Sequence, residues 1–171
     1  MFSDTFGGAL LPERRKMKIT ERYKRRHYVE VRGKWAQVGA GFAKFEEKKN
    51  PTLSRRQYFH ESGPVVSVTG YSPEIEYELD ALACGGAAEL IREITECEKF
   101  GAEAAVRVLT VDMTDTSDGG AYPAICRTYS VAADKCGGGG DLIYTGKLVC
   151  ASEALHGVFV VQSGVFVREV E

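Results

Sequence analysis

The amino-acid sequence predicts a mainly β protein, an antiparallel β-sandwich or barrel of about eight strands with one flanking α-helix. Most of its apolar segments are short, contain β-branched residues and are bounded by Gly, Pro, Asn or Asp, as expected for strands joined by turns. A helical hydrophobic period occurs once, over residues 87–100. Strands interrupted by a single helix favour an antiparallel architecture over the βαβ repeat of a parallel sheet.

The first 26 residues predict an extended basic N-terminal arm, and residues 27–171 predict one β-sandwich domain. Up to about Lys18 the chain has no hydrophobic period and contains several turn residues. Residues 27–32 alternate around Tyr28 and form the first expected strand. Residues 42–45 form a short second strand, which an Asn50-Pro51 turn closes.

The next two expected strands cover residues 65–71 and 73–82. The first is a β-branched run that ends at Ser72-Pro73. In the second, apolar residues fill one face and carboxylates fill the other, which predicts a half-buried strand. The apolar positions are Ile75, Tyr77 and Leu79, and the acidic positions are Glu74, Glu76, Glu78 and Asp80. We expect the two strands to be neighbours in the sheet.

The helix follows Gly85-Gly86 and is expected to end at Gly101, a common C-terminal stop. Its apolar stripe consists of Ala87, Leu90, Ile91, Ile94, Cys97 and Phe100. Four more strands are expected over residues 104–113, 125–133, 142–150 and 157–170. A polar loop joins the first two of these, and the Gly137 to Gly140 run precedes the third as a flexible connection.

Length and charge narrow the possible classes of protein. A chain of 171 residues and 18.7 kDa suits one domain, and its formal net charge of −2 argues against a dedicated nucleic-acid binder. We expect no signal peptide and no membrane insertion, since no apolar segment approaches the roughly 18 residues that a spanning helix needs. The five cysteines form no C-x-x-C pair, so we expect reduced cytoplasmic thiols. They are Cys84, Cys97, Cys126, Cys136 and Cys150.

Motifs that form catalytic or metal-binding sites in other proteins are better explained in this sequence as structural features. The carboxylate row has the spacing of a general acid and base, but a solvated strand face explains it better. Asp112, Asp115 and Asp118 lack the spacing of a calcium loop and predict a polar hairpin. The three histidines, at positions 27, 60 and 156, accompany no nucleophile motif. The sequence therefore predicts no enzyme, no catalytic residue, no metal site and no cofactor.

Basic residues concentrate in the N-terminal region, which leaves the rest of the chain acidic. With Tyr23, Tyr28 and Trp35 interleaved, this region offers charge and stacking to a nucleic acid. In a protein of balanced charge, contact with an acidic protein surface is favoured over that alternative. The candidate contact residues are Arg14, Arg15, Lys16, Lys18, Arg22, Lys24, Arg25 and Arg26.

Several segments, taken in order, resemble the major tail tube proteins of long-tailed bacteriophages. They are residues 35–45, Asn50-Pro51, the V-T-G-Y-S-P-E-I-E-Y run over 68–77, Phe100-Gly101, residues 106–112, Tyr122-Pro123, Gly-Gly-Asp from Gly139, Gly-Lys-Leu from Gly146, and His156-Gly157. The resemblance covers roughly residues 28–166. Each motif is a strand or turn signature, and it is their order and spacing that make the match.

The resemblance implies two packed β-sheets with a flanking helix, and hexameric rings that stack into a hollow tail tube through which DNA passes. It implies a virion protein, made in the cytoplasm of the host bacterium, whose partners are its own copies, the tape measure and the tail terminator. DNA would pass without sequence-specific binding. The long basic N-terminal region departs from the leanest family members, and we expect it to bridge rings.

Two hypotheses follow for the charged residues. Six copies of the acidic strand face would form a negative bore that repels phosphates, so we expect Glu74, Glu76, Glu78 and Asp80 to line the lumen. We expect the basic residues of one ring to contact acidic loops, such as residues 112–118, of the next ring. The alternatives are a ring protein of a contractile or secretion-type tube, or a small β-barrel module that binds a ligand or nucleic acid.

Overall fold

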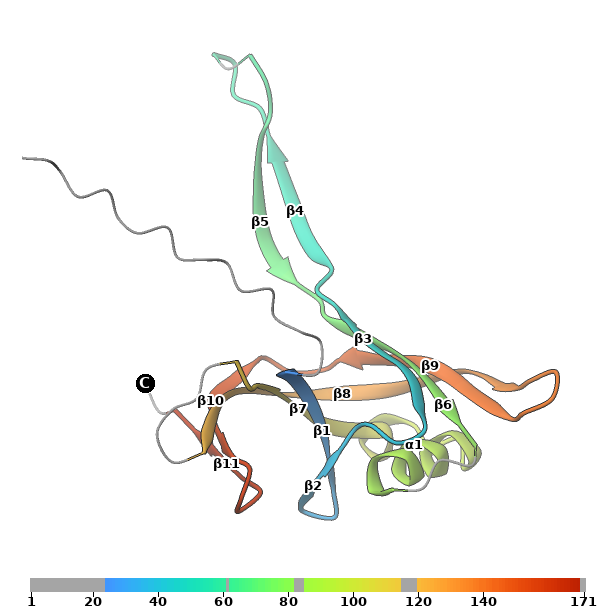
Figure 1. The fold of residues 1–171 in the computed structure, drawn as a ribbon. Coiled ribbons are helices and arrows are strands. Elements are labelled where there is room, and N and C mark those ends of the chain that lie inside the picture. Colours follow the sequence, from blue (N-terminus) through green and yellow to red (C-terminus); the bar gives the residue numbers. More distant parts are fainter. Residues whose placement is uncertain (1–23, 61, 82–84, 115–119, 170–171) are drawn as a thin grey trace, which may run out of the picture.

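The computed structural model describes residues 24–60, 62–81, 85–114 and 120–169, and over these residues the fold is mainly β with a single α-helix, as predicted (Figure 1). The strands are β1 (Arg25–Val31), β2 (Lys34–Gln37), β3 (Phe42–Lys48), β4 (Pro51–Arg56), β5 (Val65–Tyr71), β6 (Glu74–Asp80), β7 (Ala105–Asp112), β8 (Ala121–Gly137), β9 (Ile143–Cys150), β10 (Leu155–Val160) and β11 (Val165–Arg168). The helix α1 spans Gly86–Glu96, and one turn of 3-10 helix, η2, spans Gly101–Ala104. The described residues thus form eleven strands where about eight were expected.

Nine of the strands form one antiparallel sheet that curls into a half-barrel. Its path is β2-β1-β7-β8-β9-β6-β3. The long strand β8 pairs with β7 along one edge, and with β10 and then β9 along the other, while β11 pairs with β10. The curl brings β3 back toward β1. Two contacts show this: the rings of His27 and Phe45 lie 5.1 Å apart, and Arg25 forms an ion pair with Glu47.

Two apolar clusters hold the curled sheet together. The larger one fills the concave side, where Ile91 and Ile94 of α1 pack against Val29, Tyr77 and Leu148 of the sheet. The smaller cluster lies on the other face, where residues of β1, β7 and β8 pack against the β10–β11 hairpin. Its buried members are Tyr28, Leu109, Val111, Ala124, Cys126 and Phe159. The sheet is thus covered on both faces over part of its length, which is why β7 has buried residues of both parities.

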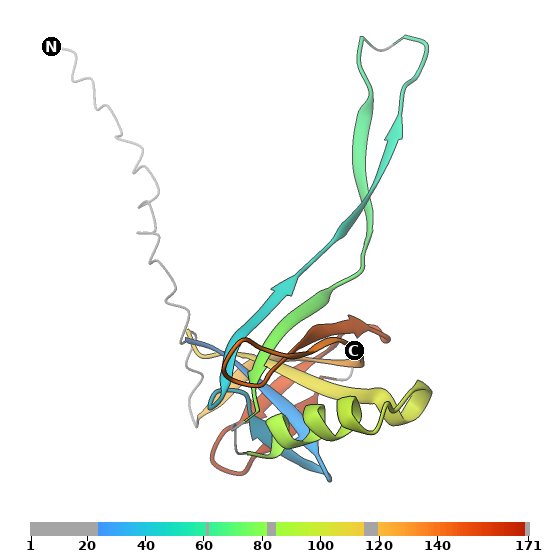
Figure 2. The ribbon, with the colours of Figure 1, turned by 90° about the vertical axis from the view of Figure 1, so that its right-hand side faces the viewer.

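The strands β3 and β6 leave the body and continue as a separate two-stranded arm. β3 pairs with β6 inside the sheet, and β4 pairs with β5 outside it, with the Ser72 N–H donating to the Asn50 carbonyl at 3.1 Å between the two parts. We call residues 51–71 the β4–β5 arm; it projects away from the body in both views (Figures 1 and 2). The expectation that residues 65–71 and 73–82 form neighbouring strands is therefore wrong.

The physical reason lies at the junction between body and arm. Asn50 has a positive φ of 43°, and Pro73 has no N–H to donate to a ladder. Each strand bends at this level without reversing, so the Asn50-Pro51 pair is a bend between β3 and β4 and not the end of a short strand. β3 consequently runs to Lys48, and β5 and β6 follow one another in the same direction.

The helix is shorter than its apolar stripe predicted. It ends at Glu96, and Glu98 adopts a positive φ of 48°. The N–H groups of Glu98 and Lys99 donate to the carbonyls of Thr95 and Ile94 at 3.2 and 3.0 Å, which is the hydrogen-bond pattern of a Schellman cap. Cys97 and Phe100, expected on the buried stripe, are consequently exposed.

The expected strand over residues 157–170 is two strands. β10 and β11 form a hairpin whose turn includes Gly164 at a φ of 65°, a conformation that favours glycine. The N–H of Gly164 donates to the carbonyl of Val160 at 2.8 Å and closes the turn. The antiparallel pairing of β7 with β8 confirms a hairpin around residues 112–120, although positions 115–119 lie outside the described residues.

Candidate functional site

The β4–β5 arm is the most unusual surface of the molecule. Large apolar side chains along it are about half exposed or more, although a strand pair in a folded domain ordinarily buries one face. The exposed fractions are Leu53 51%, Tyr58 51%, Phe59 110%, Val65 50%, Val66 51%, Val68 51% and Tyr71 61%. Sequence reasoning identified β5 but missed β4 and the arm.

The arm has one apolar and one mainly polar face. Leu53 is the cross-strand partner of Val68, and Arg55 is the partner of Val66, so these four side chains share one face. The other face carries Ser54, Arg56, Val65 and Ser67, and beyond a register shift between Thr52 and Leu53 the partner of Tyr71 is Pro51. An amphipathic strand pair of this kind is expected to bury its apolar face against another surface. The arm projects away from its own sheet, so the part of the chain that the structure describes does not supply that surface (Figures 1 and 2).

The predicted acidic row lies on β6 as expected. Ile75, Tyr77 and Leu79 are buried, and the carboxylates occupy the opposite face, which confirms the predicted alternation. The row is Glu74, Glu76, Glu78 and Asp80. We call it, together with the outward residues Lys44, Glu46 and Lys48 of β3 and Lys147 of β9, the outer charged face.

Lysines from the neighbouring strands partly neutralise this face. Lys44 Nζ lies 2.7 Å from the Glu76 carboxylate, and Lys48 contacts the other oxygen of the same group. These hydrogen bonds lower the pKa of Glu76 to about 2. Lys147 Nζ lies 3.6 Å from the carboxylate of Glu74. The sequence interpretation missed these partners, since they are brought together by strand register.

The predicted basic cluster is only partly within the described residues. Arg14, Arg15, Lys16, Lys18 and Arg22 lie outside them. Lys24 precedes β1, and Arg25 and Arg26 are its first residues, although the N-terminal arm was expected to extend to residue 26. Arg25 forms an ion pair of 2.8 Å with Glu47, and its cross-strand partner is Asp112. Its acidic neighbours in this structure therefore belong to the same chain.

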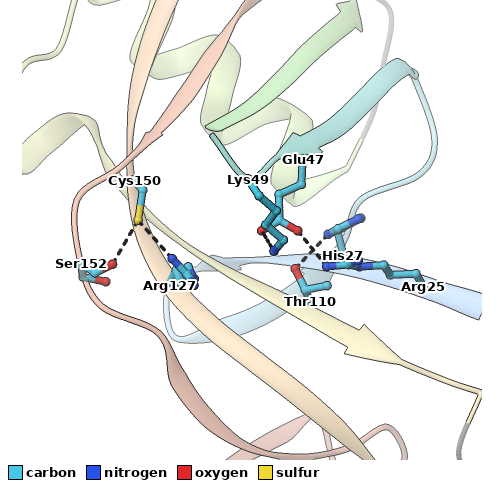
Figure 3. A network of polar contacts seen from close by, with 8 residues as sticks. All are labelled: Arg25, His27, Glu47, Lys49, Thr110, Arg127, Cys150 and Ser152. Atoms are coloured by element: carbon cyan, nitrogen blue, oxygen red, sulfur yellow. Dashed lines mark hydrogen bonds and ion pairs between the residues drawn. The ribbon is translucent and has the colours of Figure 1, made fainter. Parts of the chain in front are cut away.

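A polar network lies on the concave side of the half-barrel, near the foot of the arm (Figure 3). Glu47, whose side chain is 8% exposed, binds both Arg25 and Lys49. His27 Nδ1 lies 3.1 Å from the Thr110 hydroxyl. These contacts join β1, β3 and β7 and so hold the curl of the sheet.

The other part of this network surrounds Cys150. Its thiol donates to the Ser152 carbonyl at 3.0 Å, and the Arg127 guanidinium approaches the sulfur at 3.8 Å. Figure 3 shows Cys150 and His27 in two separate clusters, each with its own partners. The network thus lacks the thiol and imidazole contact of a cysteine nucleophile and its base.

The aromatic residues proposed for nucleic-acid stacking are used inside the fold. Tyr28 is 6% exposed and packs on Phe159, with ring centroids 4.9 Å apart. Trp35 packs against the same cluster, and the Arg107 guanidinium lies 5.4 Å from its ring centroid. Tyr23 lies outside the described residues. Tyr28 therefore has no free ring face to offer a base.

One groove lies beside the polar network, between β7, β8 and β10. It has a volume of about 420 Å³. Pro123, Ile125 and Val158 contribute its apolar lining, Asp112 and Glu169 contribute carboxylates, and Arg25 and His156 are its basic residues. Hydrogen bonds from the Thr114 hydroxyl and N–H lower the pKa of Asp112, so this carboxylate is charged at neutral pH.

The described residues contain no group of three or more His, Cys, Asp or Glu side chains placed to hold a metal ion. No helix within them is long and apolar enough to cross a bilayer. Cys97, Cys126, Cys136 and Cys150 are free thiols in this structure, and Cys84 lies outside the described residues.

Comparisons with known proteins find similarity among solved structures. No protein-family model matches this chain, and the search of curated proteins finds no match. Among solved structures, the chain is similar to a chain of the anti-feeding prophage baseplate, determined by cryo-EM with 6-fold symmetry applied. The TM-score is 0.45 and the identity 8%, over 85% of this chain and 98% of that chain. At this TM-score the similarity carries no argument about what the chain does.

Proposed function

We propose that the protein is a non-enzymatic structural subunit of a phage-type tail tube, in which its copies form hexameric rings that stack into a hollow conduit. The observation that carries the proposal is the β4–β5 arm. Its face with Leu53, Val66 and Val68 is exposed in the single chain, and the cost of leaving such a face in water is removed when another subunit covers it.

The open strand edges support the same proposal. Within the described ranges, both strands of the arm pair only with one another, and β3 and β11 each pair with a single strand. Unpaired edges invite pairing with another chain, and closed rings of identical subunits are a common way to remove them. The tape measure and tail terminator are the further partners that the proposal requires, and the virion tail is the location.

The outer charged face is the proposed lining of the bore. It lies on the opposite side of β6 from the core that contains α1, and its carboxylates outnumber its lysines. A surface of this sign repels the phosphates of passing DNA and binds none of its bases. The contact between basic N-terminal residues of one ring and the next ring remains part of the proposal.

Electron microscopy and sedimentation of the purified chain at rising concentration test the proposal. We expect six-membered rings or tubes above a threshold concentration. Val66→Thr is expected to raise this threshold, and Val65→Thr serves as the matched control, because the two valines are equally exposed but lie on opposite faces of the arm. A wild-type chain that stays monomeric at every concentration would refute the proposed function.

A further inference from the structure

The tip of the β4–β5 arm carries aromatic side chains that none of the other described residues covers. Phe59 is fully exposed, and Tyr58 beside it is 51% exposed and stacks on His60 with ring centroids 6.1 Å apart. The nearby strand ends carry Arg55 and Arg56. In sequence the arm contains Arg55, Arg56 and His60 against one acidic residue, Glu61, so its aromatic side chains are accompanied by a net positive charge.

The groove between β7, β8 and β10 has the complementary chemistry. Its lining includes the apolar side chains of Pro123, Ile125 and Val158, and its carboxylates are those of Asp112 and Glu169. Its basic residues are His156 and Arg25, and Arg25 is ion-paired with Glu47. A volume of about 420 Å³ is ample for a phenylalanine side chain and part of a neighbour. Aromatic and arginine side chains that enter such depressions are the usual energetic anchors of protein interfaces.

We propose that the tip of the β4–β5 arm of one copy docks in this groove of a second copy, with Phe59 against Pro123 and Val158 and the arm arginines near Asp112 and Glu169. The inference rests on the proposed function and names the surface that receives the arm. The occupant comes from a second copy, because the arm extends away from its own body (Figures 1 and 2).

Two other large depressions among the described residues fit the arm less well. One crosses the outer charged face, where Lys44 and Lys147 already contact the carboxylates and would repel the arm arginines. The other lies at the foot of the arm and contains Arg127, with Glu153 as its carboxylate. The depression on the outer charged face contains the carboxylates of Glu76, Glu78 and Asp134, but Lys44 already pairs with Glu76. In the groove at β10 the carboxylates are those of Asp112 and Glu169, and Arg25 is already ion-paired with Glu47.

Photo-crosslinking of the assembled full chain tests the docking. With a photoreactive phenylalanine analogue at position 59, we expect crosslinks between copies to peptides that contain Pro123 or Val158. The same analogue at position 100 is the control, because Phe100 is also exposed, at 85%, but lies beside α1. Crosslinks from position 59 to any other surface, in assemblies that form normally, overturn the docking and leave the proposed function standing.

Two pairs of variants provide an independent measurement. Phe59→Ala is expected to raise the threshold concentration for assembly at least about tenfold, as the loss of an interface anchor does, with Phe100→Ala within about twofold of wild type. Glu169→Lys is expected to raise it more than Glu153→Lys does. Equal thresholds for Phe59→Ala and wild type contradict the docking, and a wild type that never assembles contradicts the proposed function as well.

Discussion

At the scale of single residues, Glu76 is the centre of the outer charged face. Two lysines of β3 donate to its carboxylate, one to each oxygen, and its neighbour along the strand, Glu74, has a single and longer contact with Lys147. The sequence shows a row of equivalent carboxylates, but cross-strand register makes them unequal.

Glu76 should give a measurable pH dependence. Its folded-state pKa of about 2 lies below the ordinary 4.5, so its ionised form stabilises the fold at neutral pH. That contribution is complete above about pH 4.5 and disappears as the pH falls through about 2. We expect Glu76→Gln to be less stable than wild type to urea at pH 7, with the difference shrinking across this window.

Glu46→Gln is the control for this experiment, because Glu46 lies on the same face and its lysine contact is 3.8 Å long. A difference between wild type and Glu76→Gln that stays constant from pH 6 to pH 2 would exclude the assigned pKa. The expected effect is modest, since exposed ion pairs contribute little to stability.

Gly146 lies where the strands β6, β8 and β9 meet, and it admits no side chain. A Cβ at this position would lie 2.6 Å from both the Ala132 carbonyl oxygen and the Tyr77 hydroxyl. We expect Gly146→Ala to lower the free energy of unfolding by about 1–3 kcal/mol, as overpacking does. Gly139→Ala, where nothing lies within 4 Å, should change it by less than about 0.5 kcal/mol in the same denaturation experiment.

At the scale of elements, the sequence predicts best where a segment packs against its own chain. The alternation of apolar and acidic residues predicted β6 correctly, and the stripe that includes Ile91 and Ile94 predicted the buried face of α1. Both patterns arise from contacts with the core of the same molecule. The prediction of the C-terminal end of the helix was wrong, because Glu98 adopts the positive φ that the sequence rule assigns to a glycine.

β4 and the arm could not be predicted for a related reason. A hydrophobic pattern reports that a face is apolar, but it does not report which surface covers that face. In β5 the valines indicated a strand, and its pairing with β4 depended on the bends at Asn50 and Pro73. The groove was equally hidden, because its residues come from segments far apart in the chain.

The cap of α1 gives a prediction at this scale. Glu98 holds a positive φ that costs an ordinary residue about 1–2 kcal/mol, while glycine adopts it without strain. The relief of this strain is partly offset by the greater conformational entropy of glycine in the unfolded chain. We therefore expect Glu98→Gly to raise the free energy of unfolding by about 0.5–1 kcal/mol. Glu89→Gly, in the first turn of α1, should lower it, and thermal denaturation of both variants checks the opposite signs.

At the scale of the whole molecule, the half-barrel presents different chemistry in different directions. One face carries charges, the concave side holds the larger apolar core with α1, and the arm reaches outward with apolar residues exposed. This arrangement explains why balanced net charge and ordinary composition said little about function, since the informative quantity is how groups are distributed over the surface.

The proposed bore gives a prediction for the assembled particle. Neutralising Glu74, Glu76, Glu78 and Asp80 with the corresponding amides removes negative charge and leaves three lysines, so we expect passing DNA to be retarded by attraction. Tubes should still form, and the rate of genome release should fall. The control is a variant in which Glu89, Glu93 and Glu103 near α1 are neutralised instead. A normal rate of genome release from the variant neutralised on β6 would argue that the outer charged face does not line the bore.

The arm and the groove that we propose receives it are different parts of one chain. Where the arms of one ring dock in the grooves of the next ring, the contact joins unlike surfaces, so a growing stack of rings has two distinguishable ends. One end displays only projecting hairpins and the other only vacant grooves. Elongation therefore has a direction, and a protein that starts the particle must recognise a different surface from the protein that stops it.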